Sequence, residues 1–105
     1  MIVLTTLGAD ADASAFARTL IEEKLAACVS TLPPMTSVYR WQGSIEEARE
    51  QQVVIKTASS CLDALEARFR TLHPYEIPEF VVIRPHDVSA LYGTWVEESM
   101  GDGPA

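Results

Sequence analysis

Ser37-Val38-Tyr39-Arg40-Trp41-Gln42-Gly43-Ser44 is the stretch that decides the fold, because it holds the turn of a long hairpin. β-Branched and aromatic residues dominate from Cys28 to Thr57, and Gln42-Gly43-Ser44 supplies the flexible residue that a hairpin tip needs. With Gly43 at the tip, each arm runs about 14 residues, or about 46 Å at roughly 3.3 Å per residue. A compact domain of this length spans only about 33 Å. We therefore expect the ribbon to reach beyond its own domain.

Pro33-Pro34 interrupts the first arm of this hairpin. Proline cannot donate a hydrogen bond to a strand ladder, so we expect a kink or a bulge at the edge of the sheet. A long ribbon with unpaired edges is also an aggregation hazard. Pairing with an identical neighbour removes that hazard, and the sequence therefore predicts a closed homo-oligomer.

Strands and helices are expected on both sides of the hairpin. Residues 1–7 read as a strand, and the continuous apolar run 80–83 reads as a strand buried on both faces. Asp10 or Asp12 is expected to cap a first helix, Ser60 with Asp63 a second, and Ser89 a short last one. The apolar faces of the first two helices are Ala13, Phe16, Ala17, Leu20, Ile21 and Leu25, and Leu62, Leu65, Phe69 and Leu72. The order β-α-β-β-α-β with a short C-terminal helix predicts an α+β, ferredoxin-like sandwich.

Length and composition limit the classes of function. The 105 residues suit one domain, residues 1–100, followed by a flexible tail at 101–105. A net charge of −7 argues against nucleic acid as a partner. No apolar run approaches the roughly 20 residues of a membrane span, and no secretory signal is recognised, so we expect a cytoplasmic protein without a membrane partner. Cys28 and Cys61 lack metal-site spacing; we expect Cys61 to be a small buried side chain, and Cys28 less clearly so.

The stretch His73-Pro74-Tyr75-Glu76-Ile77-Pro78-Glu79 carries the densest chemistry of the chain. It joins the second helix to the last strand and combines an imidazole, a phenol and two carboxylates. Each proline restricts its own φ and the conformation of the residue before it. These side chains are therefore presented in few conformations, to a ligand, a metal or a neighbouring subunit.

Four motifs in order together resemble the CutA divalent-cation tolerance family. They are Leu25-Ala26-Ala27-Cys28-Val29, Ser37-Val38-Tyr39-Arg40-Trp41-Gln42-Gly43, Ile55-Lys56-Thr57 and residues 73–79. The resemblance runs from the first strand to Trp95. It implies a ferredoxin-like subunit in a tight homotrimer, with hairpins paired between subunits and clefts at the interfaces. It also implies a PII-like assembly and an association with copper or another divalent cation.

Metal binding by this chain depends on few side chains. The resemblance to relatives described as copper binders implies a metal site built from a thiol near the end of the first strand and from paired histidines before the Pro-Tyr step. The matching positions of this chain are Thr5 in place of the thiol and Leu72 in place of one histidine. His73 is then the one candidate metal ligand within a dense motif. A single imidazole is a poor basis for a selective site, so we favour a structural role for His73.

A small-ligand cleft between subunits is the other possibility. The candidate ligand-binding residues are Trp41, Lys56, His73, Tyr75 and Glu79. They combine aromatic surface with a few polar groups, which is typical of a pocket that orients a small molecule. The same residue types also anchor subunit contacts, so a purely structural or interaction trimer remains the alternative. Neither a nucleophile–base signature nor a phosphate loop is present, and we do not expect an enzyme.

Overall fold

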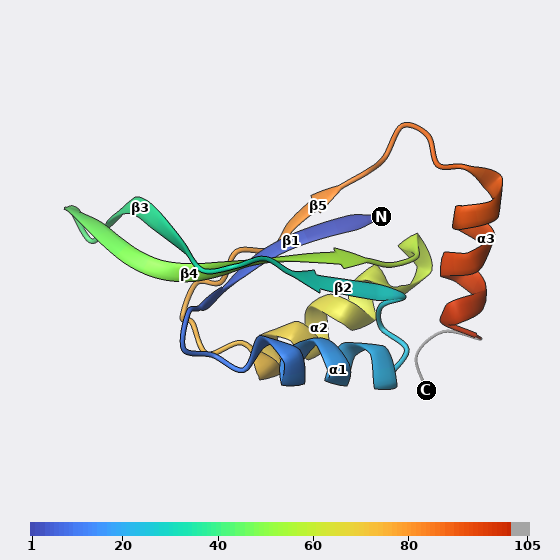
Figure 1. The fold of residues 1–105 in the computed structure, drawn as a ribbon, viewed down its shortest axis with the longest axis horizontal. Coiled ribbons are helices and arrows are strands. Elements are labelled where there is room, and N and C mark those ends of the chain that lie inside the picture. Colours follow the sequence, from blue (N-terminus) through green and yellow to red (C-terminus); the bar gives the residue numbers. More distant parts are fainter. Residues whose placement is uncertain (102–105) are drawn as a thin grey trace.

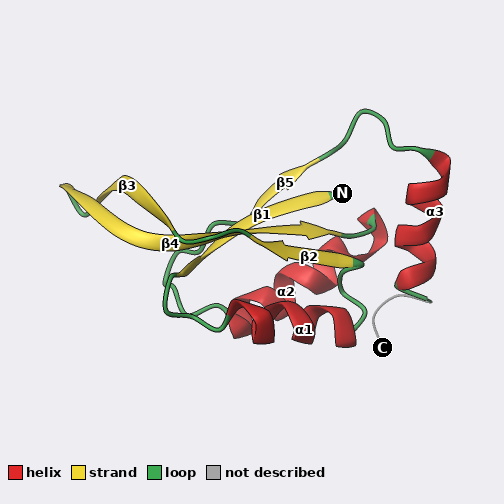
Figure 2. Ribbon diagram, in the orientation of Figure 1, coloured by secondary structure: helices red, strands yellow, loops and turns green. Residues whose placement is uncertain are grey.

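One antiparallel sheet organises the chain, with two helices covering one of its faces (Figures 1 and 2). The computed structural model describes residues 1–101. Its elements are β1 (Ile2–Gly8), α1 (Ala13–Glu22), β2 (Cys28–Thr31), β3 (Met35–Trp41), β4 (Ser44–Lys56), a 3₁₀ turn (Ser59–Cys61), α2 (Leu62–Leu72), β5 (Val81–Ile83) and α3 (Ala90–Ser99). The strand order is β2-β4-β1-β5, and β3 also pairs with β4. The predicted α+β class is confirmed.

The tip of the hairpin is a two-residue turn at the predicted place. Trp41 pairs with Ser44, and the two residues between them, Gln42 and Gly43, both have positive φ, at 49° and 83°. Two consecutive positive φ values make a type I′ turn, whose twist matches that of the flanking strands. Gly43 therefore supplies a conformation that residues with a Cβ adopt only with strain.

The first arm of the hairpin bulges at the two prolines, as predicted. Thr31 pairs with Val53, whereas Met35 pairs with Glu50. The three residues 32–34 thus face only two residues of β4, which adds one residue to the first arm. This extra residue separates β2 from β3 and bends the hairpin between its base and its tip.

The outer part of the hairpin, residues 35–49, extends past the rest of the sheet and is called the arm below (Figure 1). The pairing of β1 with β4 ends at Gly8 and Glu50. Beyond that point, within residues 1–101, β4 has a partner strand only on the β3 side. The molecule measures 44 × 28 × 23 Å, and its longest axis runs along the hairpin (Figure 1).

The apolar core lies between the sheet and the pair α1 and α2. Its fully buried side chains include Leu20 of α1, Val53 of β4 and Leu65 and Phe69 of α2. Asp12 caps α1 by accepting a hydrogen bond from the backbone N–H of Ala15, so one of the two predicted caps is confirmed. Cys61 is buried as predicted, in a second cluster with Val96 and Met100 beneath α3.

Two expectations about local structure are wrong. Ser60 does not cap α2, because residues 59–61 form a 3₁₀ turn and the helix begins at Leu62 without a side-chain cap. The strand Val81–Ile83 is not buried on both faces: its side chains are 37–47% exposed. It pairs with β1 along one edge. Ser89 does cap α3, by accepting a hydrogen bond from Tyr92 N–H.

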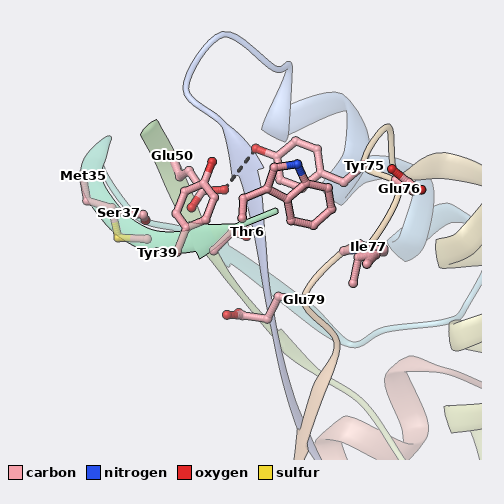
Figure 3. A pocket seen from close by; sticks show the side chains of 11 residues that line it. Thr6, Met35, Ser37, Tyr39, Glu50, Tyr75, Glu76, Ile77 and Glu79 are labelled. Carbon is pink, nitrogen blue, oxygen red and sulfur yellow. Dashed lines mark hydrogen bonds between the residues drawn. The ribbon is translucent and has the colours of Figure 1, made fainter. Parts of the chain in front are cut away.

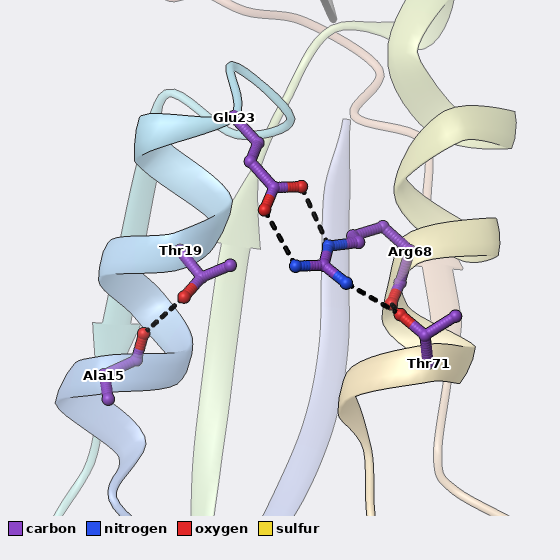
Figure 4. A network of polar contacts seen from close by, with 5 residues as sticks. All are labelled: Ala15, Thr19, Glu23, Arg68 and Thr71. Atoms are coloured by element: carbon purple, nitrogen blue, oxygen red, sulfur yellow. Dashed lines mark hydrogen bonds and ion pairs between the residues drawn. The ribbon is translucent and has the colours of Figure 1, made fainter.

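An ion pair links the two covering helices on their solvent side (Figure 4). Arg68 of α2 donates through Nε and one terminal nitrogen to the two carboxylate oxygens of Glu23, at 2.8 and 2.9 Å. Arg68 also donates to Thr71 Oγ1. A two-pronged contact of this kind fixes the relative orientation of the side chains better than a single bond does.

The last described residue, Gly101, follows α3. Gly101, the first residue of the expected tail, is described and ends the turn after α3, with a φ of 56°. Residues 102–105, the rest of that tail, lie outside the described residues. None of the helices described is long and apolar enough to cross a membrane.

Candidate functional site

A cavity of about 670 Å³ opens on the face of the sheet that α1 and α2 leave uncovered (Figure 3). Side chains of a strand alternate between its two faces. Val53 and Ile55 of β4 face the helices, so Glu50 and Gln52 face the other way. The cavity is lined by residues of β1, β3, β4 and the loop before β5: Thr6, Met35, Ser37, Tyr39, Trp41, Glu50, Tyr75, Glu76, Ile77, Pro78 and Glu79.

Tyr75 and Glu50 form a partly buried, hydrogen-bonded pair in this cavity. The Tyr75 hydroxyl donates a hydrogen bond of 3.0 Å to Glu50 Oε2, and only 8% of Glu50 is exposed (Figure 3). The pKa of Tyr75 is raised to about 12, first by burial and then, in decreasing order, by the hydrogen bond to Glu50, the charge of Glu50 and the neighbouring Tyr39. The phenol therefore stays protonated and remains a hydrogen-bond donor at neutral pH.

Glu79 is held in place from the sheet. Its Oε2 accepts a hydrogen bond of 3.0 Å from Gln52 Nε2, which also donates to the carbonyl oxygen of Thr5 at 2.7 Å. Gln52 thus joins β1, β4 and the loop that follows α2. The carboxylate is half-buried at the cavity and faces neither lysine nor arginine within 4.0 Å among residues 1–101.

His73 lies behind the cavity rather than in it. It is 7% exposed, its Nε2 donates to the carbonyl oxygen of Thr6 at 2.6 Å, and its Nδ1 accepts from the backbone N–H of Tyr75 at 3.1 Å. Both ring nitrogens are therefore used. The ring also contacts the rings of Phe69 and Tyr75, with centroid distances of 5.0 and 4.7 Å. The geometry favours the structural role of His73 over its expected roles in binding a ligand or a metal.

Lys56 is separated from the other candidate residues. It lines a second cavity, of about 450 Å³, together with residues of α3, and its ammonium group lies 5.6 Å from the centre of the Tyr92 ring. Trp41, Tyr75 and Glu79 all line the first cavity. The structure therefore brings three of the five candidates together, places the fourth in another cavity and buries the fifth.

Two important residues of the site were missed by the sequence analysis, Glu50 and Gln52. Glu50 follows three charged residues, Glu46, Glu47 and Arg49, a pattern typical of a solvated ribbon. The sequence did contain a signal, because side chains alternate between the two faces of a strand. With Val53 and Ile55 on the apolar face of β4, the even-numbered residues near them are expected on the opposite face. The contact with Tyr75, 25 residues further on, depends on tertiary packing.

The residues described do not suit a copper or zinc site within one chain. Among residues 1–101 there is no group of three histidine, cysteine or acidic side chains that could hold a metal ion. Both nitrogens of His73 are used, and the two cysteines are free thiols that contact Ser30 and Ser60 at 3.9 Å. Nitrogen and sulfur ligands, which these metals prefer, are thus not gathered at one point.

Comparison with known proteins gives a consistent result. The family model described as "CutA1 divalent ion tolerance protein" matches residues 1–99. The chain is 38% identical over 100 residues to the divalent-cation tolerance protein CutA of Thermus thermophilus, covering 95% of this chain and 97% of that protein. It is 41% identical over 86 residues to protein CutA of Homo sapiens, of whose length it covers 48%.

Solved structures agree in fold over nearly the whole chain. The divalent cation tolerance protein (Cut A1) of Thermus thermophilus superposes with a TM-score of 0.89 at 38% identity, over 95% of this chain and 97% of that one. A PII-like protein CutA from Nostoc superposes with a TM-score of 0.87 at 34% identity, over 94% and 95% of the two chains.

Proposed function

The chain belongs to the CutA1 divalent ion tolerance protein family, and from this we propose that it acts as a homotrimer of PII-like, ferredoxin-like subunits that bind a small ligand in clefts between them. In this proposal the protein serves the response to divalent cations, copper among them, by binding and signalling. It is not an enzyme. Its location is cytoplasmic, where its free cysteines would stay reduced.

One observation carries the trimer: the arm and β5 present apolar side chains to the outside of the single chain. Val38 is 62% exposed, Ile45 is 70% exposed, and β5 is exposed along its length. A strand ribbon with apolar side chains and a free edge invites a further strand. A sister chain placed there would cover the arm and β5.

The cavity supports a small ligand better than a metal. Its volume of about 670 Å³ falls within the roughly 300–1,000 Å³ of small-molecule sites, and its walls are aromatic and apolar with a few polar groups. The donor atoms that copper or zinc needs are not gathered within residues 1–101. In the proposed function, a divalent cation therefore acts through ligands shared between chains or through the small ligand.

The hydrogen-bond partners of His73, Cys28 and Cys61 favour a binding role over a catalytic one. Nucleophilic catalysis needs a nucleophile within hydrogen-bond reach of a base. Within residues 1–101, the nitrogens of His73 contact only the backbone of Thr6 and Tyr75, and Cys28 and Cys61 contact serine hydroxyls.

Light scattering tests the assembly. We expect the wild-type chain of 11.5 kDa to elute with three times that mass. Ile45→Glu, which puts a charge on the exposed apolar arm, should lower the mass towards that of one chain. Ala15→Glu adds the same charge on the exposed side of α1 and should leave the mass unchanged. A folded wild-type monomer at micromolar concentration would refute the trimer.

A thermal-shift screen tests the binding role against the purely structural trimer. By linkage, a ligand that binds only the folded protein raises the melting temperature. We expect at least one compound to do so, and Glu79→Ala to abolish the effect while Glu98→Ala, on the exposed side of α3, retains it. The structural alternative predicts that no metal ion or metabolite gives a shift that depends on Glu79.

A further inference from the structure

All the ionisable carboxyl and basic groups that line the cavity are acidic. Its lining contains three carboxylates, from Glu50, Glu76 and Glu79, and no lysine, arginine or histidine. The remaining walls are built largely from Tyr39, Trp41 and Tyr75, whose ring faces attract cations. A cavity with acidic groups and aromatic rings suits a positively charged organic molecule.

Glu50 is a buried carboxylate without a positively charged partner among residues 1–101. It is 92% buried, and a glutamate so deeply buried is rarely without a partner of opposite charge. Its Oε2 accepts the Tyr75 hydroxyl, whereas its Oε1 accepts no hydrogen bond from residues 1–101. No basic group of these residues lies within 4.0 Å of it. Because Glu50 lines the cavity, an occupant can reach the free oxygen.

We propose that the small ligand is a protonated alkylamine, an inference that rests on the proposed binding role of the same cavity. Its ammonium group donates to Glu50 Oε1, and its alkyl chain lies against the rings of Trp41 and Tyr39. Tyr75 orients Glu50 by holding the other oxygen. Glu79, held by Gln52, offers a second carboxylate, so a diamine is expected to bind more tightly than a monoamine.

Other ligand classes fit these groups less well. Nucleotides and other phosphate compounds would bring negative charge towards three carboxylates. Copper and zinc prefer nitrogen and sulfur ligands, which this lining lacks apart from the thioether of Met35. A basic side chain from a sister chain of the proposed trimer could also neutralise Glu50, and that arrangement would exclude the amine.

Fluorescence and calorimetric titrations test the proposal. The Trp95→Phe variant leaves Trp41 as the single tryptophan, so its emission reports on the cavity. The probes are 1,4-diaminobutane, butylamine, butanoate and ATP. We expect 1,4-diaminobutane to change the emission with saturation, butylamine to bind several-fold more weakly, and butanoate and ATP to have no effect.

Matched variants locate the binding site. Glu50→Gln keeps the shape and the acceptor for Tyr75 but removes the charge, and should weaken 1,4-diaminobutane binding by about tenfold or more. Glu79→Gln should weaken the diamine more than the monoamine. Glu98→Gln, an equal change of charge outside the cavity, should leave both affinities unchanged. Should Glu50→Gln fail to fold, as circular dichroism would show, Glu79→Gln carries the test alone.

The outcomes separate this inference from the proposed function. Equal affinities of wild type, Glu50→Gln and Glu79→Gln, or no amine binding at all, would overturn the amine proposal. If butanoate or ATP instead changes the Trp41 emission, the cavity binds small molecules of another class and the proposed function survives. If no probe acts here and no compound in the thermal-shift screen acts through Glu79, the binding role itself fails.

Discussion

The two faces of the sheet differ sharply, although the same strands build both. In β4, Val53 is fully buried against α1 and α2, whereas its neighbour Gln52 lies on the other face and donates a hydrogen bond to Glu79. The helix-covered face is completed by the chain itself. The open face combines the partly exposed rings of Tyr39 and Trp41 on the arm with a buried carboxylate that has no basic partner among residues 1–101. One face is therefore packed by the chain itself, whereas the other leaves side chains that residues 1–101 do not cover.

Adjacent valines of β4 test this difference most directly. Val53→Ala removes fully buried carbon atoms from the core and should lower the free energy of unfolding by about 2 kcal/mol. Val54→Ala is the same change on the open face, where the side chain is only half-buried, and should cost less than about 1 kcal/mol. Chemical denaturation at one protein concentration measures both. Equal losses would mean that the open face is packed as densely in solution as the core.

Thr5 is the exception on the helix-covered face. It is fully buried, with 0% of its surface exposed to solvent, and its hydroxyl has no hydrogen-bond partner among the described residues. Thr5→Val keeps the shape and removes the unsatisfied group, so we expect a gain of about 1 kcal/mol in the free energy of unfolding.

Thr57→Val is the matched control for Thr5→Val. The Thr57 hydroxyl is also buried, but it donates a hydrogen bond of 2.8 Å to the carbonyl oxygen of Leu25. The same substitution should therefore destabilise the protein by about 1 kcal/mol. A loss at both positions would show that Thr5 has a partner in solution.

Much of the fold follows from local sequence signals. The turn at Gln42-Gly43 and the bulge at Pro33-Pro34 were predictable because backbone rules of single residues determine them. The start of α2 was mispredicted because Ser60 resembles a cap, yet a 3₁₀ turn precedes the helix. The exposure of β5 was mispredicted because an apolar run shows that a strand needs cover, without showing whether its own chain provides it.

The candidate site was harder to predict than the fold. Trp41, Tyr75 and Glu79 meet at one cavity, as their dense motifs suggested. Glu50 escaped prediction because a buried acid and a solvated acid look alike in sequence, and only tertiary contacts separate them. His73 belongs to the same motif as Tyr75, but its side chain points behind the cavity and supports the backbone of that loop.

Titration of Tyr75 probes the buried side of the open face. We expect ultraviolet difference spectroscopy to show one tyrosine with a pKa of about 12, lost in Tyr75→Phe and lowered in Glu50→Gln. The ordinary value is about 10. Because the folded-state pKa is the higher one, the unfolded chain loses this proton first, and the stabilisation is present below pH 10 and lost as pH rises through 12. Tyr75 is 37% exposed, so solvent screening reduces this effect on stability.

A tyrosine titration in which every phenol has an ordinary pKa would contradict the buried Tyr75–Glu50 pair. A titration that moves further upward would indicate deeper burial than the single chain gives. Tyr75 would then be covered by a sister chain, which would sharpen the contrast between the two faces.

The smallest effect is expected on the outer surface of the covering helices. The Glu23–Arg68 pair is two-pronged, but its side chains are 41% and 39% exposed, and exposed pairs of this kind contribute little to stability. Glu23→Gln should lower the free energy of unfolding only slightly at low salt, and by less at high salt. Glu66→Gln, which breaks the single contact to the more exposed Arg70, should cost less still. A larger, salt-independent loss at Glu23 would mean that the pair, and not only the core beneath it, holds α1 and α2 together over the sheet.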